Sequence, residues 1–147
     1  MAISSLSGTK LSGQSAAIVS GGTFSTYTGN GTNGVSGQVY NVYTFTGTSV
    51  LNVTVPGYAD LLIVGGGGAG GSYYGGGGGG AGGVLQVTGA YFPTPGTYTV
   101  TVGGGGAAAV YNASDNGNAS SVGSYVSPGG GTDRKSTRLN SSHANIS

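Results

Sequence analysis

The most informative segment of the sequence, residues 61–71, reads Leu-Leu-Ile-Val-Gly-Gly-Gly-Gly-Ala-Gly-Gly. Its apolar run is typical of a strand buried on both faces, and the strand runs directly into a glycine tract. Residues 101–107 repeat the arrangement as Thr-Val-Gly-Gly-Gly-Gly-Ala. We expect the two strand-to-glycine units to be neighbours in one sheet system, with four side chains buried together: Leu61, Ile63, Val100 and Val102.

Short strands are also predicted on either side of these units. They are expected at residues 16–19, 23–27, 39–45, 50–55, 84–87, 97–102 and 121–126. The link 46–48 predicts a hairpin between two of them, and Pro56-Gly57 predicts a turn because proline fixes φ and glycine accepts positive φ. No stretch has helical periodicity. The predicted fold is all-β, a small β-sandwich-like framework, with residues 1–37 as a Ser/Thr/Gly-rich lead-in and 38–132 as a glycine-rich β domain.

The glycine tracts allow two interpretations. The chain has 35 Gly and 4 Pro in 147 residues, which is a share typical of low-complexity sequences. Only 5% of its residues are charged, whereas disorder normally requires high net charge. Polyproline II (PPII) helices have three residues per turn, and all-glycine ones could pack side by side through amide hydrogen bonds. The tracts are therefore either packed antiparallel PPII helices or disordered loops.

The segment 133–147 differs from the rest of the chain. Residues 1–132 carry one positive and two negative charges (Lys10, Asp60 and Asp115), a net charge of −1, whereas Asp133, Arg134, Lys135 and Arg138 add a net +2. Asp-Arg-Lys-Ser-Thr-Arg-Leu-Asn-Ser-Ser-His at 133–143 resembles the translation of a common sequencing adapter, and 144–147 fit the bases that follow. We therefore expect a non-native tail and a natural chain that is truncated near Thr132.

Several function classes are disfavoured by the composition. The natural part has no basic patch for nucleic acid, the chain has no Cys, and no apolar run reaches the length of a membrane helix. Two Asp without Glu leave little capacity for acid–base catalysis. Residues 65–70 satisfy the dinucleotide pattern G-x-G-x-x-G, but more glycines follow where a helix is required. We expect no enzyme activity, no cofactor and no membrane insertion.

One short polar segment could bind a metal. Asp115-Asn116-Gly117-Asn118 offers oxygen ligands at short spacing, but one carboxylate is few for calcium. A turn around Asn116-Gly117 is the preferred interpretation, and we expect no metal site.

The order of the elements over about residues 45–131 resembles the glycine-rich domain of phage tail fibres and the polyglycine tip adhesins. The resemblance rests on Thr-Val-Pro-Gly at 54–57, the units at 60–71 and 75–83, Pro-Gly-Thr-Tyr-Thr-Val-Thr-Val-Gly at 95–103, and Asn-Gly at 116–117. It implies a non-enzymatic, virion-borne domain that contacts a host-surface receptor, an outer-membrane protein or a glycan, and other fibre subunits. The alternative is a bacterial cell-surface or extracellular filament or matrix protein.

The tyrosines divide into two groups. Tyr40, Tyr43 and Tyr98 lie in predicted strands and should be half-buried. The others interrupt or follow glycine tracts, where tyrosine offers a large rigid contact face and a hydroxyl, or else covers the tract ends. The candidate receptor-binding residues are Ser72, Tyr73, Tyr74, Tyr111 and Asn112.

Overall fold

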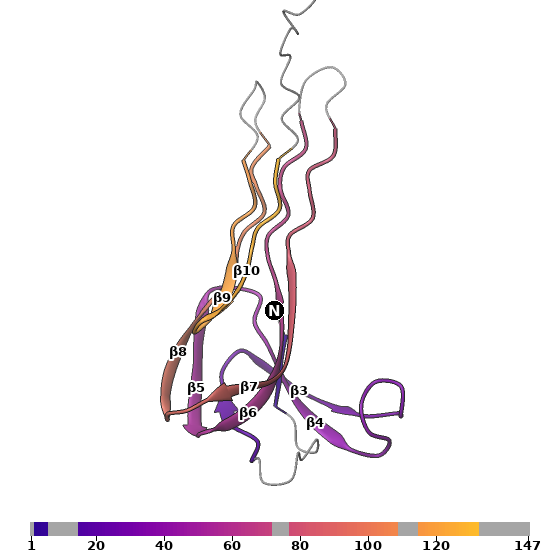
Figure 1. Cartoon of the computed structure of the whole chain (residues 1–147), viewed down its shortest axis with the longest axis vertical. Coiled ribbons are helices and arrows are strands. Elements are labelled where there is room, and N and C mark those ends of the chain that lie inside the picture. Colours follow the sequence, from indigo (N-terminus) through magenta and orange to yellow (C-terminus); the bar gives the residue numbers. More distant parts are fainter. Residues whose placement is uncertain (1, 6–14, 72–76, 109–114, 133–147) are drawn as a thin grey trace, which may run out of the picture.

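The computed structural model describes residues 2–5, 15–71, 77–108 and 115–132. Within these residues ten strands form two five-stranded sheets, and extended glycine tracts rise from one end of them (Figure 1). Sheet A has the order β3-β4-β1-β6-β7 and sheet B has the order β10-β9-β8-β5-β2. All pairings within the sheets are antiparallel. The predicted all-β fold is confirmed, and no helix occurs in the described residues.

The chain crosses several times from one sheet to the other. Sheet A contains β1 (Ala2–Ser5), β3 (Thr23–Thr28), β4 (Val39–Thr44), β6 (Gly57–Val64) and β7 (Val84–Phe92). Sheet B contains β2 (Ile18–Ser20), β5 (Ser49–Val55), β8 (Gly96–Thr101), β9 (Ser120–Val122) and β10 (Tyr125–Ser127). The lead-in predicted at 1–37 thus supplies β1, β2 and β3 to the sheets.

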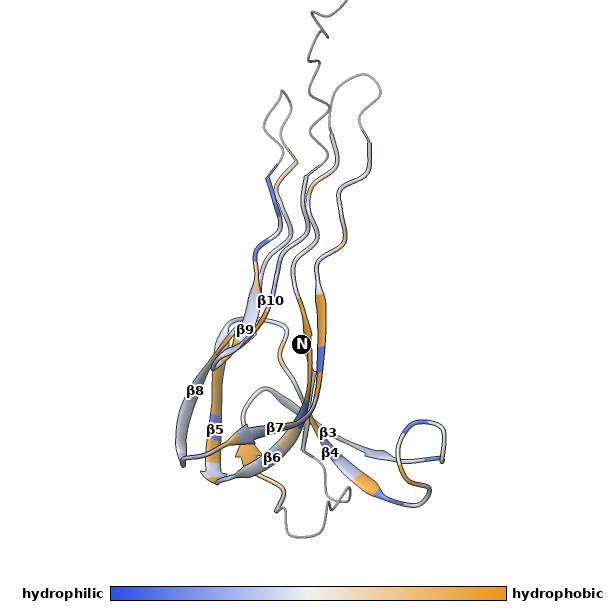
Figure 2. Cartoon of the chain, viewed as in Figure 1, coloured by the Kyte–Doolittle hydropathy of each residue, from blue (hydrophilic) through white to orange (hydrophobic). Residues whose placement is uncertain are grey.

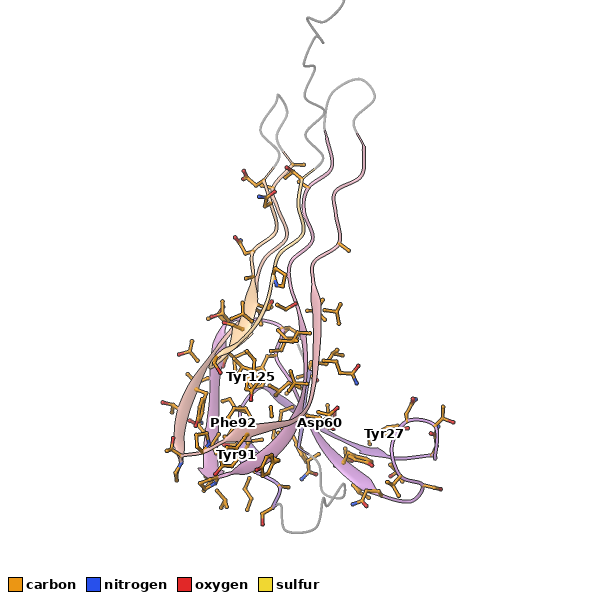
Figure 3. All side chains as sticks on the ribbon, viewed as in Figure 1. Tyr27, Asp60, Tyr91, Phe92 and Tyr125 are labelled. Carbon is orange, nitrogen blue, oxygen red and sulfur yellow. The ribbon has the colours of Figure 1, made fainter. Side chains whose placement is uncertain are left out.

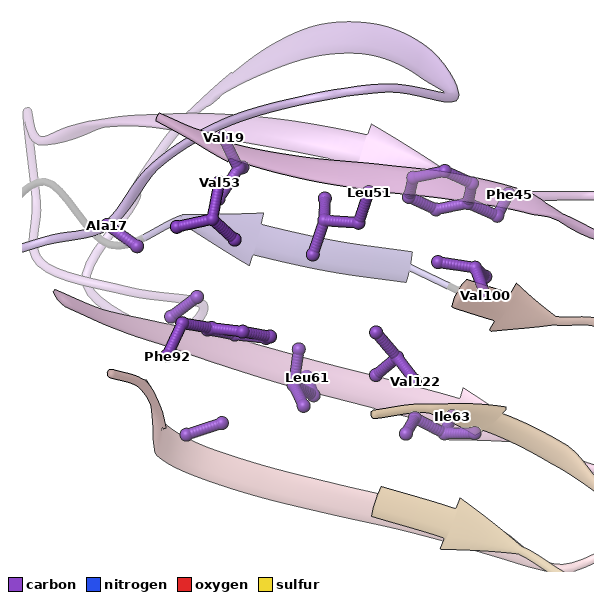
Figure 4. Close-up of a cluster of buried hydrophobic side chains, with 12 residues drawn as sticks. Ala17, Val19, Phe45, Leu51, Val53, Leu61, Ile63, Phe92, Val100 and Val122 are labelled. Carbon is purple, nitrogen blue, oxygen red and sulfur yellow. The ribbon is translucent and has the colours of Figure 1, made fainter. Parts of the chain in front are cut away.

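The hydrophobic core lies between the two sheets (Figure 4). Leu61 and Ile63 on β6 are buried against residues from sheet B such as Val100 on β8. Alternation along β6 leaves Leu62 and Val64 exposed on the outer face of sheet A. The prediction that this strand is buried on both faces is therefore wrong, because sheet A is covered on one face only.

The predicted hairpin between 39–45 and 50–55 is also wrong. β4 belongs to sheet A and β5 belongs to sheet B, so residues 45–48 carry the chain from one sheet to the other. Phe45 lies in this link and is fully buried in the core. Burial of the aromatic ring between the sheets thus replaces the tight turn that the local sequence favours.

The two strand-to-glycine units lie in opposite sheets and are not neighbours in one sheet. β6 runs in sheet A and β8 in sheet B, so their buried residues meet across the core. Leu61, Ile63 and Val100 are buried as predicted, and Val102 is partly buried against the same cluster. The strand predicted at 121–126 is two strands, β9 and β10, because Gly123 adopts a positive φ of 56° and reverses the chain.

The β3–β4 hairpin extends sideways from the sandwich (Figure 1). Its loop is closed by backbone hydrogen bonds. Oδ1 of Asn30 also accepts hydrogen bonds from the backbone amides of Thr32 and Asn33. Tyr40 is buried beneath the loop and its hydroxyl accepts the Val35 amide at 2.8 Å. Tyr43 and Tyr98 pack partly buried against the core, so the predicted burial of these three tyrosines is confirmed.

Candidate functional site

Five extended segments form a bundle above the sandwich (Figure 1). Each begins or ends at a strand of the sandwich. Tract 1 (65–71) follows β6, tract 2 (77–83) precedes β7, tract 3 (103–108) follows β8, tract 4 (115–119) precedes β9 and tract 5 (128–132) follows β10. Side chains crowd on the sandwich and become sparse along these tracts (Figure 3). The tracts are mostly neutral in hydropathy, except for the hydrophilic residues of tract 4 (Figure 2).

The hydrogen bonds between tracts 1 and 2 recur at every third residue. The amides of Gly65, Gly68 and Gly71 donate to the carbonyl oxygens of Gly83, Gly80 and Gly77, at 2.8, 2.8 and 3.0 Å. A β-ladder would repeat every second residue, whereas a PPII helix has three residues per turn. The spacing therefore identifies two antiparallel PPII-type helices, so the first of the two interpretations, packed helices, holds for the described part of these tracts.

Tract 1 is the centre of the bundle, because it has a partner on each of its faces. Its amides at Gly66 and Ala69 donate to tract 4, at Asn118 and Asp115. Its carbonyl oxygens accept hydrogen bonds from tracts 3 and 5, through the amides of Gly106 and Gly130. With the bonds to tract 2, all four other tracts are attached to tract 1. Successive residues of a three-residue turn point in three directions, and Gly66 bonds to two tracts because its amide donates to tract 4 and its carbonyl oxygen accepts from tract 5. One tract can therefore bind four partners.

The outer tracts are also joined to one another. Tract 2 donates to tract 5 from Gly80 and Gly83, and tract 4 donates to tract 3 from Asp115 and Asn118. Tract 4 also donates to tract 5, from Gly117 to Gly130 at 2.8 Å. The bundle is therefore a connected layer of backbone hydrogen bonds and needs no side-chain core.

Packing at this distance requires glycine. A Cβ atom added at Gly66 would overlap the carbonyl oxygen of Gly104, and one added at Gly117 would overlap that of Gly66. The same holds at Gly68, whose Cβ would meet the carbonyl oxygen of Gly131. Other positions are open, since a Cβ at Gly78 would meet nothing within 4 Å. Positions of a tract that face a neighbouring tract are therefore restricted to glycine, whereas positions that face away from the other tracts can accept a larger residue.

The end of the bundle remote from the sandwich is the candidate site. Tracts 1 and 2 end there with the Gly71–Gly77 hydrogen bond, and tracts 3 and 4 end there with the amide of Asp115 donating to Ala107 at 3.1 Å. Tract 5 reaches the same end, where the amide of Thr132 donates to Oδ1 of Asn116 at 2.9 Å. This end, here called the distal end, carries an exposed carboxylate and an exposed side-chain amide, those of Asp115 and Asn116.

All five predicted receptor-binding residues lie outside the described part of the chain. Ser72, Tyr73 and Tyr74 belong to the segment 72–76, which connects tracts 1 and 2. Tyr111 and Asn112 belong to the segment 109–114, which connects tracts 3 and 4. The described residues that flank both segments lie together, because Ala69 donates to the carbonyl oxygen of Asp115 at 3.1 Å. Both segments are therefore attached at the distal end.

A comparison with protein families finds a match over residues 43–146, to a family described as a glycine-rich domain. The matched range covers most of the chain and includes strands β5 to β10 and all five tracts. The chain belongs to this glycine-rich domain family. No curated protein and no solved structure matches it.

The matched range of the glycine-rich domain begins close to the predicted residue 45 and continues beyond 131. It includes most of the adapter-like segment 133–147, so the comparison does not separate that segment from the domain. The segment also lies outside the described residues. Its non-native origin stays a prediction.

The predicted turn at Asn116-Gly117 is absent from the glycine-rich domain. Residues 115–119 form tract 4, and Gly117 packs against tract 1 without a positive φ. The close approach of backbone to backbone thus decides the conformation there, and the local turn preference does not. Among the described residues, no three His, Cys, Asp or Glu side chains gather to hold a metal ion. No described residue belongs to a helix that could span a bilayer.

Two features of the sandwich were missed from the sequence. Tyr58 and Tyr91 stack across β6 and β7 with ring centroids 4.8 Å apart. Oδ1 of Asp60 accepts the amide of Gly89 at 2.8 Å, at a bulge where Gly89 has a φ of 70°. Partial burial raises the pKa of the Asp60 carboxyl, and this hydrogen bond opposes the rise. The Gly within the β7 sequence was the signal for this bulge.

Proposed function

We propose that this chain is a non-enzymatic structural and receptor-binding domain of a phage tail fibre or adhesin, carried on the virion. The observation that supports the proposal is the attachment of both tract-connecting segments at one end of a backbone-bonded bundle, remote from the sandwich. Such a bundle holds the connecting segments away from the sandwich that anchors the tracts.

The sides of the bundle are poorly suited to recognition. Their described residues are mostly glycine and alanine, which offer backbone groups but few side chains to distinguish one ligand from another. Recognition is therefore assigned to the distal end, where Ser72, Tyr73, Tyr74, Tyr111 and Asn112 are attached. Tyrosine rings stack on the apolar faces of sugars or on protein loops, while their hydroxyls form hydrogen bonds.

The partner is a host-surface receptor, either an outer-membrane protein or a glycan. Fixing both ends of a short segment by the hydrogen bonds at Gly71–Gly77 and Ala107–Asp115 lowers the conformational entropy lost on binding. The described part of the distal end carries one charge, on Asp115, so apolar stacking and neutral hydrogen bonds would supply most of the affinity.

The test is the adsorption of virions that carry Tyr73→Ala together with Tyr74→Ala. Adsorption should fall at least about tenfold, since losing hot-spot aromatic contacts typically costs 2 kcal/mol or so. Tyr91→Ala is the matched control, because Tyr91 is an exposed tyrosine on the sandwich. Thermal melting verifies that all variants fold. Normal adsorption by a folded double variant would overturn the assignment of recognition to this segment.

A further inference from the structure

The outer edge of β3 has no strand paired to it in the described part of the chain. β3 is the last strand of sheet A, and its register with β4 is continuous over all six residues. Its sequence, Thr-Phe-Ser-Thr-Tyr-Thr, has high β-propensity and contains no charge, proline or glycine. All six residues are exposed, including Phe24 at 57% and Tyr27 at 38%. Such an edge is a template for another strand.

The other sheet edges in the described structure have the protection that β3 lacks. β2 and β10, at the edges of sheet B, are three residues long. β7, at the far edge of sheet A, is interrupted by the bulge at Gly89, which Asp60 holds in place. Short strands and bulges are the usual means of preventing edge-to-edge pairing. β3 therefore differs from β2 and β10 in its length of six residues, and from β7 in its unbroken register.

We propose that β3 pairs antiparallel with β3 of a second copy of this chain and so joins two copies of sheet A into one continuous sheet. The hairpin projects away from the sandwich and the bundle, which leaves room for a second molecule (Figure 1). The charged side chains in the described residues, Asp60 and Asp115, lie on other elements, so two approaching copies of the hairpin meet without like-charge repulsion.

Two-fold symmetry restricts the register of this pairing. The side chains of directly opposite residues in an antiparallel pair lie on the same face of a sheet. A two-fold axis must therefore place one residue opposite the same residue of the second copy, and cannot place it opposite the next residue along the strand. The central registers place either Ser25 opposite Ser25 or Thr26 opposite Thr26 of the second copy. Tyr27 is then opposite Thr23 or Ser25. The first arrangement is an aromatic–β-branched pair of the kind that stabilises sheets.

Single cysteines can test the pairing directly, because the chain has no Cys of its own. Ser25→Cys and Thr26→Cys variants are oxidised with copper phenanthroline in air, and covalent dimers are measured by non-reducing electrophoresis. We expect one of the two to cross-link efficiently, which also identifies the register. Thr88→Cys is the matched control, since Thr88 is an exposed threonine on the bulged edge strand β7. Equal cross-linking of all three variants would overturn the proposal.

Association without covalent bonds is measured by sedimentation equilibrium over a range of concentrations. We expect the wild-type chain to dimerise, and Thr26→Lys and Ser25→Lys to weaken dimerisation by about tenfold or more, because each places like charges next to the axis. Thr88→Lys should leave it unchanged. A wild-type chain that is monomeric throughout, or a dimer that persists in both lysine variants while they remain folded, would overturn the proposal. Neither readout involves a receptor, so the result is independent of the proposed function.

Discussion

The sandwich and the bundle use glycine for opposite reasons. In the sandwich, Gly89 and Gly123 adopt positive φ values of 70° and 56°, where other residues are strained. In the described tracts no glycine has a positive φ, and Gly66 and Gly117 are needed because a Cβ would overlap a neighbouring backbone. The sandwich is held by buried side chains and the bundle by hydrogen bonds between main chains. The two halves should therefore respond differently to the same class of substitution.

The largest effect is expected in the sandwich core. Ile63→Ala removes a fully buried side chain two residues before tract 1 and should lower the free energy of unfolding by about 2–5 kcal/mol. Leu62→Ala, its exposed neighbour, should change it by less than about 0.5 kcal/mol. Chemical denaturation of both variants measures the difference. Equal stability of Ile63→Ala and the wild type would contradict the assignment of the core.

The bundle should be broken by a single methyl group. Gly66→Ala places a Cβ against the carbonyl oxygen of Gly104 and should destabilise the bundle by at least about 1–3 kcal/mol. Gly78→Ala, at an open position, should be neutral or stabilising by about 0.4–1 kcal/mol, because alanine restricts the unfolded chain.

Hydrogen exchange measures whether Gly66→Ala destabilises the bundle alone or the sandwich as well. The amides of Gly65, Gly68 and Gly80 should lose protection, while those shared by β5 and β8 should keep most of theirs. If Gly66→Ala and Gly78→Ala exchanged alike, the close packing of the tracts would be contradicted. If the sandwich lost protection equally, the two halves would unfold as one unit.

Substitution of two buried serines at the junction of the sandwich and the bundle should change stability by smaller amounts, and the two substitutions should differ in sign. Ser120 Oγ accepts the amide of Gly103 at 2.9 Å, so Ser120→Ala leaves that amide without its acceptor and should cost about 1 kcal/mol. Ser127 Oγ is buried without a hydrogen-bond partner in the described structure, so Ser127→Ala should be neutral or stabilising. Thermal melting of Ser120→Ala and Ser127→Ala measures whether each substitution lowers or raises the melting temperature. The hydrogen bond from Gly103 would be unimportant if both variants melted alike.

The sequence predicted the bundle better than it predicted the topology of the sandwich. Glycine runs fixed at both ends by strands can be ordered only by close backbone approach, so residues 65–71 and 75–83 predicted either packed PPII helices or disordered loops. The hydrogen bonds between the described tracts favour the first of these alternatives. The choice between a hairpin and a crossover after β4 depended on burial of Phe45 between the sheets. That burial is a long-range property, which the local turn signal at 46–48 does not contain.

The sequence predicted that the candidate binding segments are attached at the ends of the tracts. It did not predict which tracts pack against one another. The position of Ser72, Tyr73 and Tyr74 between two tracts indicated a shared end, and the described ends of those tracts lie together. The Asn116-Gly117 pair misled because its turn preference is local, whereas Gly117 is held by tracts 1 and 5. In a PPII helix every third residue faces the same neighbour. The choice of neighbour for each set of residues depends on how all five tracts pack together, which the local sequence does not contain.

The smallest effect is expected from the one carboxylate that supports the sandwich backbone. The raised pKa of Asp60 means that the folded state binds a proton more readily than the unfolded state. Stability therefore contains a contribution that is fully present below the unfolded pKa, near 3.8, and that is lost as the pH rises through the folded pKa.

Asp60→Asn removes this titration and keeps an oxygen that can accept the Gly89 amide. The wild type should gain stability relative to Asp60→Asn as the pH falls from neutral toward 4, and the variant should be at least as stable as the wild type at pH 7. Melting curves of the two chains across this range provide the measurement, with hydrogen exchange of the tract amides as a control. Those amides should not respond to the substitution, because Asp60 lies on the outer face of sheet A and the tracts are held by uncharged main-chain groups. A wild-type chain that lost stability relative to Asp60→Asn on acidification would show that attraction to the Gly89 amide outweighs burial at this carboxylate, so that a side chain contributes to the bulge by its charge.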